Sequence, residues 1–105
     1  MYFAVDLATE PPSVTLAEPD DFKAFEIRVV DDGGDRGRLK EAIAPLGSLD
    51  DEGYAWLRQE DVKRLAGDRA ADPAWTESFE GLVGYARSHD WVNARGELRA
   101  HTEWP

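Results

Sequence analysis

An α+β domain with two layers is the fold that this chain of 105 residues favours. Stretches that alternate apolar and polar side chains, typical of strands, occur in both halves of the chain. Stretches with apolar residues three and four apart, typical of helices, lie between them. We expect a single globular domain over residues 1–105, because this length suits one core. Helices should cover one face of a mainly antiparallel sheet of about four strands, in the order β-β-β-α-β-α-α-β.

Alternation with a period of two predicts the strands. The clearest case is the stretch 22–30, where Phe25, Ile27 and Val29 share one face and Glu26 and Arg28 the other. The remaining strands are expected at 2–7, 14–17, 54–57 and 97–104. In the last of these, one face carries Leu98, Ala100, Thr102 and Trp104 and the other carries Glu97, Arg99, His101 and Glu103.

Helices are expected at 36–44, 59–66 and 73–89, each with a start or stop signal. Asp35 can cap the first through its carboxylate, and Gly67 can close the second. The third starts with the pair Asp72–Pro73, a common helix start. Its predicted core face is Trp75, Phe79, Leu82, Val83 and Ala86. Gly81 and Gly84 lie off this face, where either a close neighbour requires them or they are tolerated.

The charge of the chain excludes several classes of partner. The net charge is −10, and residues 1–35 hold nine acidic residues against Lys23 and Arg28. Because nucleic acids and anionic membranes are bound through clustered lysine and arginine, neither is an expected partner. The chain has no cysteine, which removes disulfides and thiolate chemistry. No secretory signal or membrane-length apolar run is visible, so we expect a cytoplasmic protein.

No established catalytic motif is present. The sequence lacks G-x-S-x-G, the phosphate-binding G-x-x-x-x-G-K-[ST] and H-E-x-x-H. The acidic stretch "DDGGD" at 31–35 does not match a calcium loop. The two histidines, His89 and His101, match no metal-ligand spacing, so we expect neither a metal site nor a cofactor.

The stretch "WVNARGEL" at 91–98 predicts a tight turn, with Asn93 bonding to its own backbone and Gly96 at positive φ. His89 then falls at the end of the last helix, half-buried, where the helix dipole favours a cation. His101 falls on the charged face of the outgoing strand and should be exposed.

Two hypotheses for function follow. The first is a small acidic, non-catalytic interaction module, such as an inhibitor, immunity or antitoxin-like protein, that binds a basic protein surface through Asp31, Asp32 and Asp35. The second is a small-ligand binder or modest enzyme with a pocket near Trp91. Its candidate binding residues are His89, Trp91, Arg99, His101 and Glu103. A concave pocket of about 300 Å³ or more at these side chains would favour the second hypothesis, and a convex acidic face the first.

Overall fold

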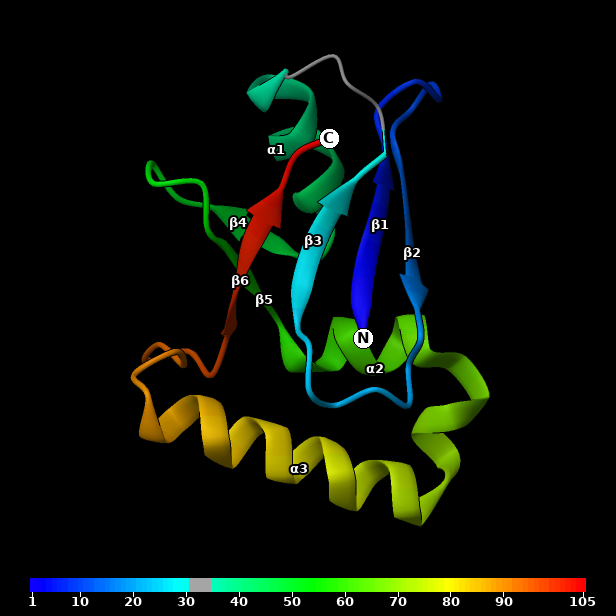
Figure 1. Cartoon of the computed structure of the whole chain (residues 1–105), viewed down its shortest axis with the longest axis vertical. Coiled ribbons are helices and arrows are strands. Elements are labelled where there is room, and N and C mark those ends of the chain that lie inside the picture. Colours follow the sequence, from blue (N-terminus) through cyan, green and yellow to red (C-terminus); the bar gives the residue numbers. More distant parts are fainter. Residues whose placement is uncertain (31–34) are drawn as a thin grey trace.

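A computed structural model describes residues 1–30 and 35–105 of the chain. It contains six strands, three α-helices and one short 3-10 helix, shown in Figure 1. The strands are β1 (Tyr2–Asp6), β2 (Ser13–Ala17), β3 (Glu26–Val29), β4 (Gly47–Leu49), β5 (Ala55–Leu57) and β6 (Leu98–Glu103). The helices are α1 (Arg36–Ile43), α2 (Gln59–Ala66), the 3-10 helix η1 (Gly67–Ala71) and α3 (Pro73–Ser88).

The strands form one curled, mixed sheet in the order β2-β1-β3-β6-β5-β4. β1 pairs with β2 in antiparallel fashion and with β3 in parallel fashion. β6 lies in the interior of the sheet, parallel to β3 on one side and antiparallel to β5 on the other. The last strand of the sequence therefore joins the first three strands to the β4–β5 hairpin.

The α+β class is confirmed, but the expected sheet of about four mainly antiparallel strands is only partly correct. The additional strand β4 lies between the helix expected at 36–44 and the strand expected at 54–57, where no strand was expected. It is short, and it pairs along its whole length with β5. The two parallel pairings could not be deduced from alternation, because the period of a strand carries no information about the direction of its neighbour.

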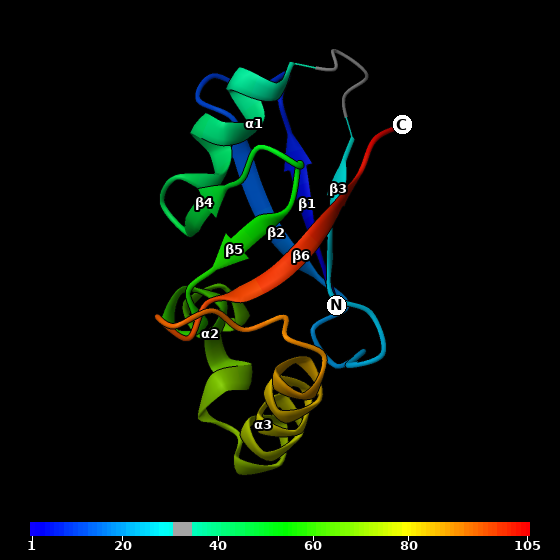
Figure 2. The ribbon, with the colours of Figure 1, turned by 90° about the vertical axis from the view of Figure 1, so that its left-hand side faces the viewer.

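The helices do not all lie on one face. α1 and α2 cover the same face of the sheet, whereas α3 runs across its end, below the start of β3 and β6 (Figure 2). Among residues 1–30 and 35–105, no helix covers the opposite face. No described helix is both long and apolar enough to cross a membrane.

The core forms where the inward side chains of the strands meet the helices. Phe3 of β1, Ile27 of β3 and Leu98 of β6 are almost completely buried there, as their alternation predicts. Phe79 of α3 is fully buried and stacks on Trp75, with ring centroids 5.2 Å apart. Burial of such rings is the main stabilising contribution that a domain of this size can obtain.

The predicted core face of α3 is largely correct. Trp75, Phe79, Val83 and Ala86 are buried, and Leu82 is half-buried against the core. Asp72 caps the helix by accepting a hydrogen bond from the amide of Ala74 (2.9 Å). Sharing a strand face with Leu98 and Ala100 predicted that Trp104 would also lie in the core. That prediction is wrong, because Trp104 follows the end of β6 and is 37% exposed.

The glycines of α3 and β4 have opposite roles. A Cβ added at Gly81 or Gly84 would meet nothing within 4 Å, so no close neighbour requires a glycine there. A Cβ added at Gly47 would lie 1.8 Å from the carbonyl oxygen of Trp56, so β4 can pair with β5 only because this position has no side chain.

Replacing Phe79 by alanine should reduce the free energy of unfolding by about 3–5 kcal/mol, because it removes a fully buried ring and leaves a cavity. Gly81→Ala on the same helix is the control, and it should stabilise the protein by up to about 1 kcal/mol because alanine is the better helix former. Urea denaturation of both variants measures these changes. A Phe79→Ala midpoint equal to that of the wild type would contradict the core assignment.

Candidate functional site

A hollow of about 300 Å³ lies between α3 and the start of β3 and β6. Its apolar walls include Phe22 and Phe25 from the segment before β3, Tyr85 from α3 and Trp91. Its polar walls include Lys23, Glu26, Arg99 and His101. This is the pocket near Trp91 that one of the two functional hypotheses requires.

The end of α3 places Trp91 at this hollow. The amide of Trp91 donates to the carbonyl of Ala86 (2.9 Å), and the amide of Asp90 donates to that of Arg87 (3.2 Å). These two bonds form a Schellman motif, in which the residue after the cap has a positive φ. Asp90 occupies that position with φ 62°, and the chain reverses so that Trp91 packs back toward α3.

The turn that follows brings Arg99 beside Trp91. The side-chain oxygen of Asn93 accepts from the amides of Arg95 (3.0 Å) and Glu97 (2.9 Å), and Gly96 has φ 78°, as the sequence predicted. The amide of Arg99 then donates to the carbonyl of Trp91 (2.9 Å). The tryptophan ring and the arginine side chain are thus held by one short hydrogen-bonded turn.

The guanidinium group of Arg99 stacks on aromatic rings. It lies 4.3 Å from the ring centroid of Tyr54 and 5.5 Å from that of Trp91. The side chain is half-buried, and among the described residues the guanidinium has no hydrogen-bonding or ion-pair partner. Because a guanidinium group carries five N–H donors, these donors are available to a bound anion.

Asp50 positions Tyr54 under Arg99. Its carboxylate accepts hydrogen bonds from the amides of Glu52 and Tyr54 (both 2.9 Å) and from the indole nitrogen of Trp56 (3.0 Å). Desolvation alone would raise the pKa of Asp50, but the hydrogen bonds from Trp56 and the backbone outweigh it and hold this pKa below its usual value. The ionised carboxylate therefore stabilises the β4–β5 turn.

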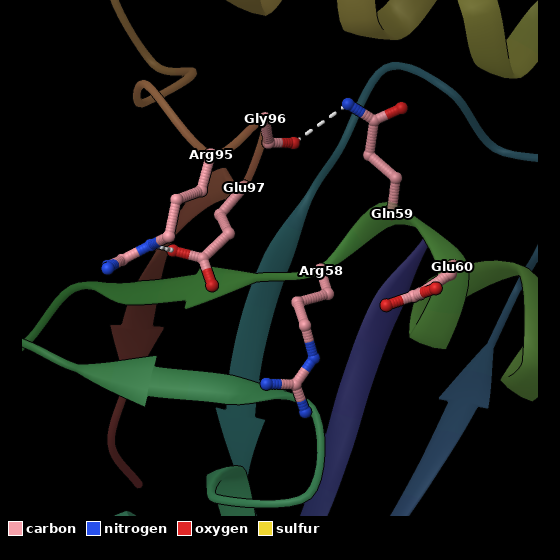
Figure 3. A pocket seen from close by; sticks show the side chains of 6 residues that line it. All are labelled: Arg58, Gln59, Glu60, Arg95, Gly96 and Glu97. Carbon is pink, nitrogen blue, oxygen red and sulfur yellow. Dashed lines mark hydrogen bonds and ion pairs between the residues drawn. The ribbon is translucent and has the colours of Figure 1, made fainter.

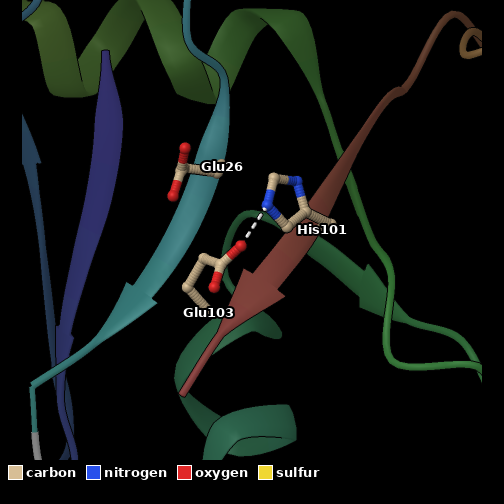
Figure 4. Close-up of side chains that lie close together, drawn as sticks. All are labelled: Glu26, His101 and Glu103. Carbon is tan, nitrogen blue, oxygen red and sulfur yellow. Dashed lines mark hydrogen bonds and ion pairs between the residues drawn. The ribbon is translucent and has the colours of Figure 1, made fainter. Parts of the chain in front are cut away.

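The other polar side chains of the site come from β3 and β6. Glu26 and His101 are direct partners in the parallel pairing, and Glu103 follows two residues later on the same face (Figure 4). Nε2 of His101 lies 2.7 Å from a carboxylate oxygen of Glu103. Glu26 also forms an ion pair with Arg28, whose Nε lies 3.1 Å from its carboxylate.

A second hollow, of about 540 Å³, lies at the turn before β6 and the start of α2 (Figure 3). Both of its arginines already have protein partners: Arg95 bonds to the buried carboxylate of Glu97 (3.2 Å), and Arg58 bonds to Asp61 (2.6 Å). Gln59 donates to the carbonyl of Gly96 (2.8 Å). Although this hollow is larger, both of its arginines are paired within the protein, and its remaining carboxylate, Glu60, is exposed, so we regard the hollow at Trp91 as the candidate site.

The structure brings together some of the predicted site residues. Trp91, Arg99 and His101 line the hollow, and Glu103 bonds to His101 beside it. Asp35 lies elsewhere and caps α1, accepting from the amides of Gly37 (2.9 Å) and Arg38 (3.2 Å). Asp31 and Asp32 lie outside the described residues.

The two histidines differ from each other. His101 is exposed, as expected. His89 is not half-buried as predicted but exposed at the end of α3, where its ring stacks on that of Trp91 with centroids 4.6 Å apart. The prediction failed because α3 ends at Ser88, so the helical spacing used to place His89 does not extend to that residue.

Sequence reasoning missed Glu26, Tyr54 and Tyr85 as site residues. For Glu26 a signal existed, since alternation placed it on the polar face of its strand. What alternation could not provide was the pairing of that strand with β6, which depends on contacts between residues 75 positions apart in the chain. Tyr54 and Tyr85 carried no signal, because tyrosine is a residue of intermediate burial and an isolated one indicates neither core nor surface.

This arrangement can hold a small ligand that has an apolar body and an anionic group. Aromatic side chains offer contact area, and Arg99 offers charged hydrogen-bond donors. The pair His101–Glu103 resembles a base oriented by a carboxylate. The residues that line the hollow include no serine, threonine or cysteine, so the lining offers no side-chain nucleophile of that kind.

No protein-family model, no curated protein and no solved structure matches the chain.

Replacing Asp90 by glycine should stabilise the protein by up to about 1 kcal/mol, because glycine adopts positive φ without strain. The change also removes a negative charge from the negative end of the helix dipole. Asp90→Val should instead destabilise the protein by about 1–3 kcal/mol, since a β-branched residue is strained at this φ. Thermal unfolding of the two variants measures both effects, and equal melting temperatures would contradict the assigned helix end.

Replacing Asp50 by asparagine should reduce stability at pH 7 by about 1–3 kcal/mol, because charged hydrogen bonds are lost. The pKa of Asp50 is lower in the folded protein than in the unfolded chain. The stabilisation is therefore complete above the unfolded pKa of about 3.9 and is lost as the pH falls through the folded value. Urea denaturation of wild type and variant from pH 7 to pH 2 should show the difference between them shrinking toward the acid end. A difference independent of pH would contradict the role of the ionised carboxylate.

Proposed function

We propose that this protein binds a small organic anion, with an aromatic or otherwise apolar body, in the hollow between α3 and the start of β3 and β6. One observation carries this proposal: a half-buried arginine, Arg99, stacks on aromatic rings and has no anionic partner among the described residues. A partly desolvated charge without an anionic partner costs free energy. Binding an anionic ligand is therefore a physical reason for the protein to retain such a charge.

The local charge of the hollow supports an anionic ligand. The whole chain carries −10, yet the hollow presents Lys23 and Arg99. The carboxylate that also lines it, Glu26, is offset by the nearby Arg28. Because the chain carries a surplus of acidic residues, it repels anions in general. Basic side chains that gather in one hollow therefore favour a specific contact with an anion over non-specific attraction.

The size and walls of the hollow restrict the ligand. A volume of about 300 Å³ is at the lower end of the range for ligand pockets. Phe22, Tyr85 and Trp91 provide ring surfaces at its walls. A monocyclic or bicyclic aromatic carboxylate combines a flat body for these rings with a group that guanidinium binds in bidentate fashion.

The hypothesis of an interaction with a basic protein surface stays a prediction. It relied on Asp31, Asp32 and Asp35. The first two lie outside the described residues, and the carboxylate of Asp35 already accepts two backbone amides of α1. Asp20, in the same acidic third of the chain, forms an ion pair with Arg69. These contacts give two of the acidic side chains a structural role, so we place ligand binding before protein binding.

Aromatic carboxylates should bind to the purified protein with a preference that depends on Arg99. Benzoate, 1-naphthoate and indole-3-acetate, each paired with its neutral amide, serve as probes in titrations followed by amide and indole NMR signals. The carboxylates should shift the indole signal of Trp91 and bind at least about tenfold more tightly than the amides, as expected for one charged hydrogen-bonded pair.

Arg99→Gln should remove this preference. The matched control is Arg87→Gln, which removes the same charge from the exposed end of α3 and should leave the preference unchanged. Equal affinity of carboxylates and amides for the wild type would contradict the proposal. Equal loss in both variants would also contradict it, because it would indicate a general effect of charge.

A further inference from the structure

We propose that Glu26, His101 and Glu103 form a binding site for a divalent transition-metal ion such as Zn²⁺ on the uncovered face of the sheet. Each of the three side chains offers one ligand atom, and these atoms all lie within 4.8 Å of one another. Figure 4 shows the side chains of His101 and Glu103 directed toward each other on β6, with Glu26 on the adjacent strand β3. Imidazole with carboxylates is a ligand set that suits zinc and its neighbours in the first transition series.

The backbone fixes the three ligands with respect to one another. Glu26 and His101 are direct partners across the β3–β6 pairing, and His101 and Glu103 are two residues apart on one strand. Both relationships put side chains on the same face of the sheet. Residues 101–103 of β6 pair with β3, directly after the residues 98–100 that pair with β5, so the ligand positions lie on paired strands rather than in a loop.

Only small side-chain movements would complete the site. Ligand atoms about 2.0–2.2 Å from a tetrahedral zinc ion lie about 3.3–3.6 Å apart. The three ligand atoms here lie within 4.8 Å of one another, so the largest separation exceeds that spacing by at most about 1.2–1.5 Å. The imidazole of His101 and the carboxylate of Glu103, 2.7 Å apart, already share a hydrogen bond that an ion would replace. Both side chains are at least half exposed, so they can rotate without disturbing the core.

The site would also be accessible. Glu26 and His101 line the hollow beside Trp91, and His101 lines a second depression together with Tyr54 and Trp104. Three protein ligands would leave the fourth position of a tetrahedral ion open to water or to another ligand. The inference does not depend on the proposed carboxylate ligand, since it requires only the three side chains.

Arg28 opposes metal binding. Its guanidinium lies 3.1 Å from the carboxylate of Glu26 and is held over the ring of Tyr2, with its central carbon 3.9 Å from the centroid. The positive charge competes with an ion for Glu26. Removing it should therefore strengthen metal binding, an effect opposite in sign to the loss of a ligand.

The sequence did not predict this site. His89 and His101, the only histidines of the chain, have no recognisable metal-ligand spacing, and they belong to different places in the structure. The third ligand comes from a strand 75 residues earlier, which becomes a neighbour only through the parallel pairing of β3 and β6.

A zinc titration of the untagged protein, followed by NMR of the histidine side chains and by calorimetry, tests the inference. The chain has two histidines, so each imidazole signal can be assigned with one variant. Zinc should shift the signals of His101 and leave those of His89 in place, with one ion bound per chain. His101→Gln and the double variant Glu26→Gln, Glu103→Gln should each weaken binding by tenfold or more, and Arg28→Gln should strengthen it severalfold.

His89→Gln is the matched control, because His89 is also exposed but does not belong to the cluster of Glu26, His101 and Glu103, and this variant should bind zinc as the wild type does. Melting temperatures without metal verify that every variant is folded. Equal shifts of both histidines, or affinities that agree within about twofold across the wild type and the ligand variants, would overturn the inference. Failure of carboxylate binding would leave this result unaffected, so the two proposals can fail separately.

Discussion

The insertion of β6 between β3 and β5 is the constraint on which the rest of the structure depends. Without it, the strands β2, β1 and β3 and the β4–β5 hairpin would be separate pieces of sheet. The same insertion buries Leu98 and Ala100 and leaves Arg99, His101 and Glu103 on the uncovered face. One side of β6 thus faces the core and the other side carries residues of the candidate site. The alternation of side chains along this strand determines both.

Local structure was predictable from the sequence where hydrogen bonds between nearby residues determine it. The start of α3 at Asp72–Pro73, the cap at Asp35 and the turn at Asn93–Gly96 all form through hydrogen bonds within four residues. Alternation also placed Arg99 and His101 on the polar face of their strand. In each of these cases the determining contact is close in sequence, so a pattern of residues is sufficient to predict it.

The remainder depended on contacts between distant residues. The pairing of Glu26 with His101, the close approach of Gly47 to Trp56 and the stacking of Arg99 on Tyr54 arise only in the assembled sheet. The reversal at Asp90 shows a further limit: a non-glycine residue at positive φ carries no sequence signal, yet it determines where Trp91 lies. The hollow forms through distant contacts of this kind, so the sequence predicted only some of the residues that line it.

The central place of β6 has a consequence for how the molecule folds. β3 and β5 each present an unpaired edge until a strand from 40 or more positions later in the chain arrives between them. Closing such long loops costs conformational entropy before the new contacts between strands can offset it. The final assembly of the sheet should therefore be slow and cooperative. Arg99 and His101 reach their neighbours in that same event. A partly folded chain therefore lacks the hollow altogether. A ligand that occupies the hollow would lengthen the lifetime of the whole folded sheet rather than restrict a local motion.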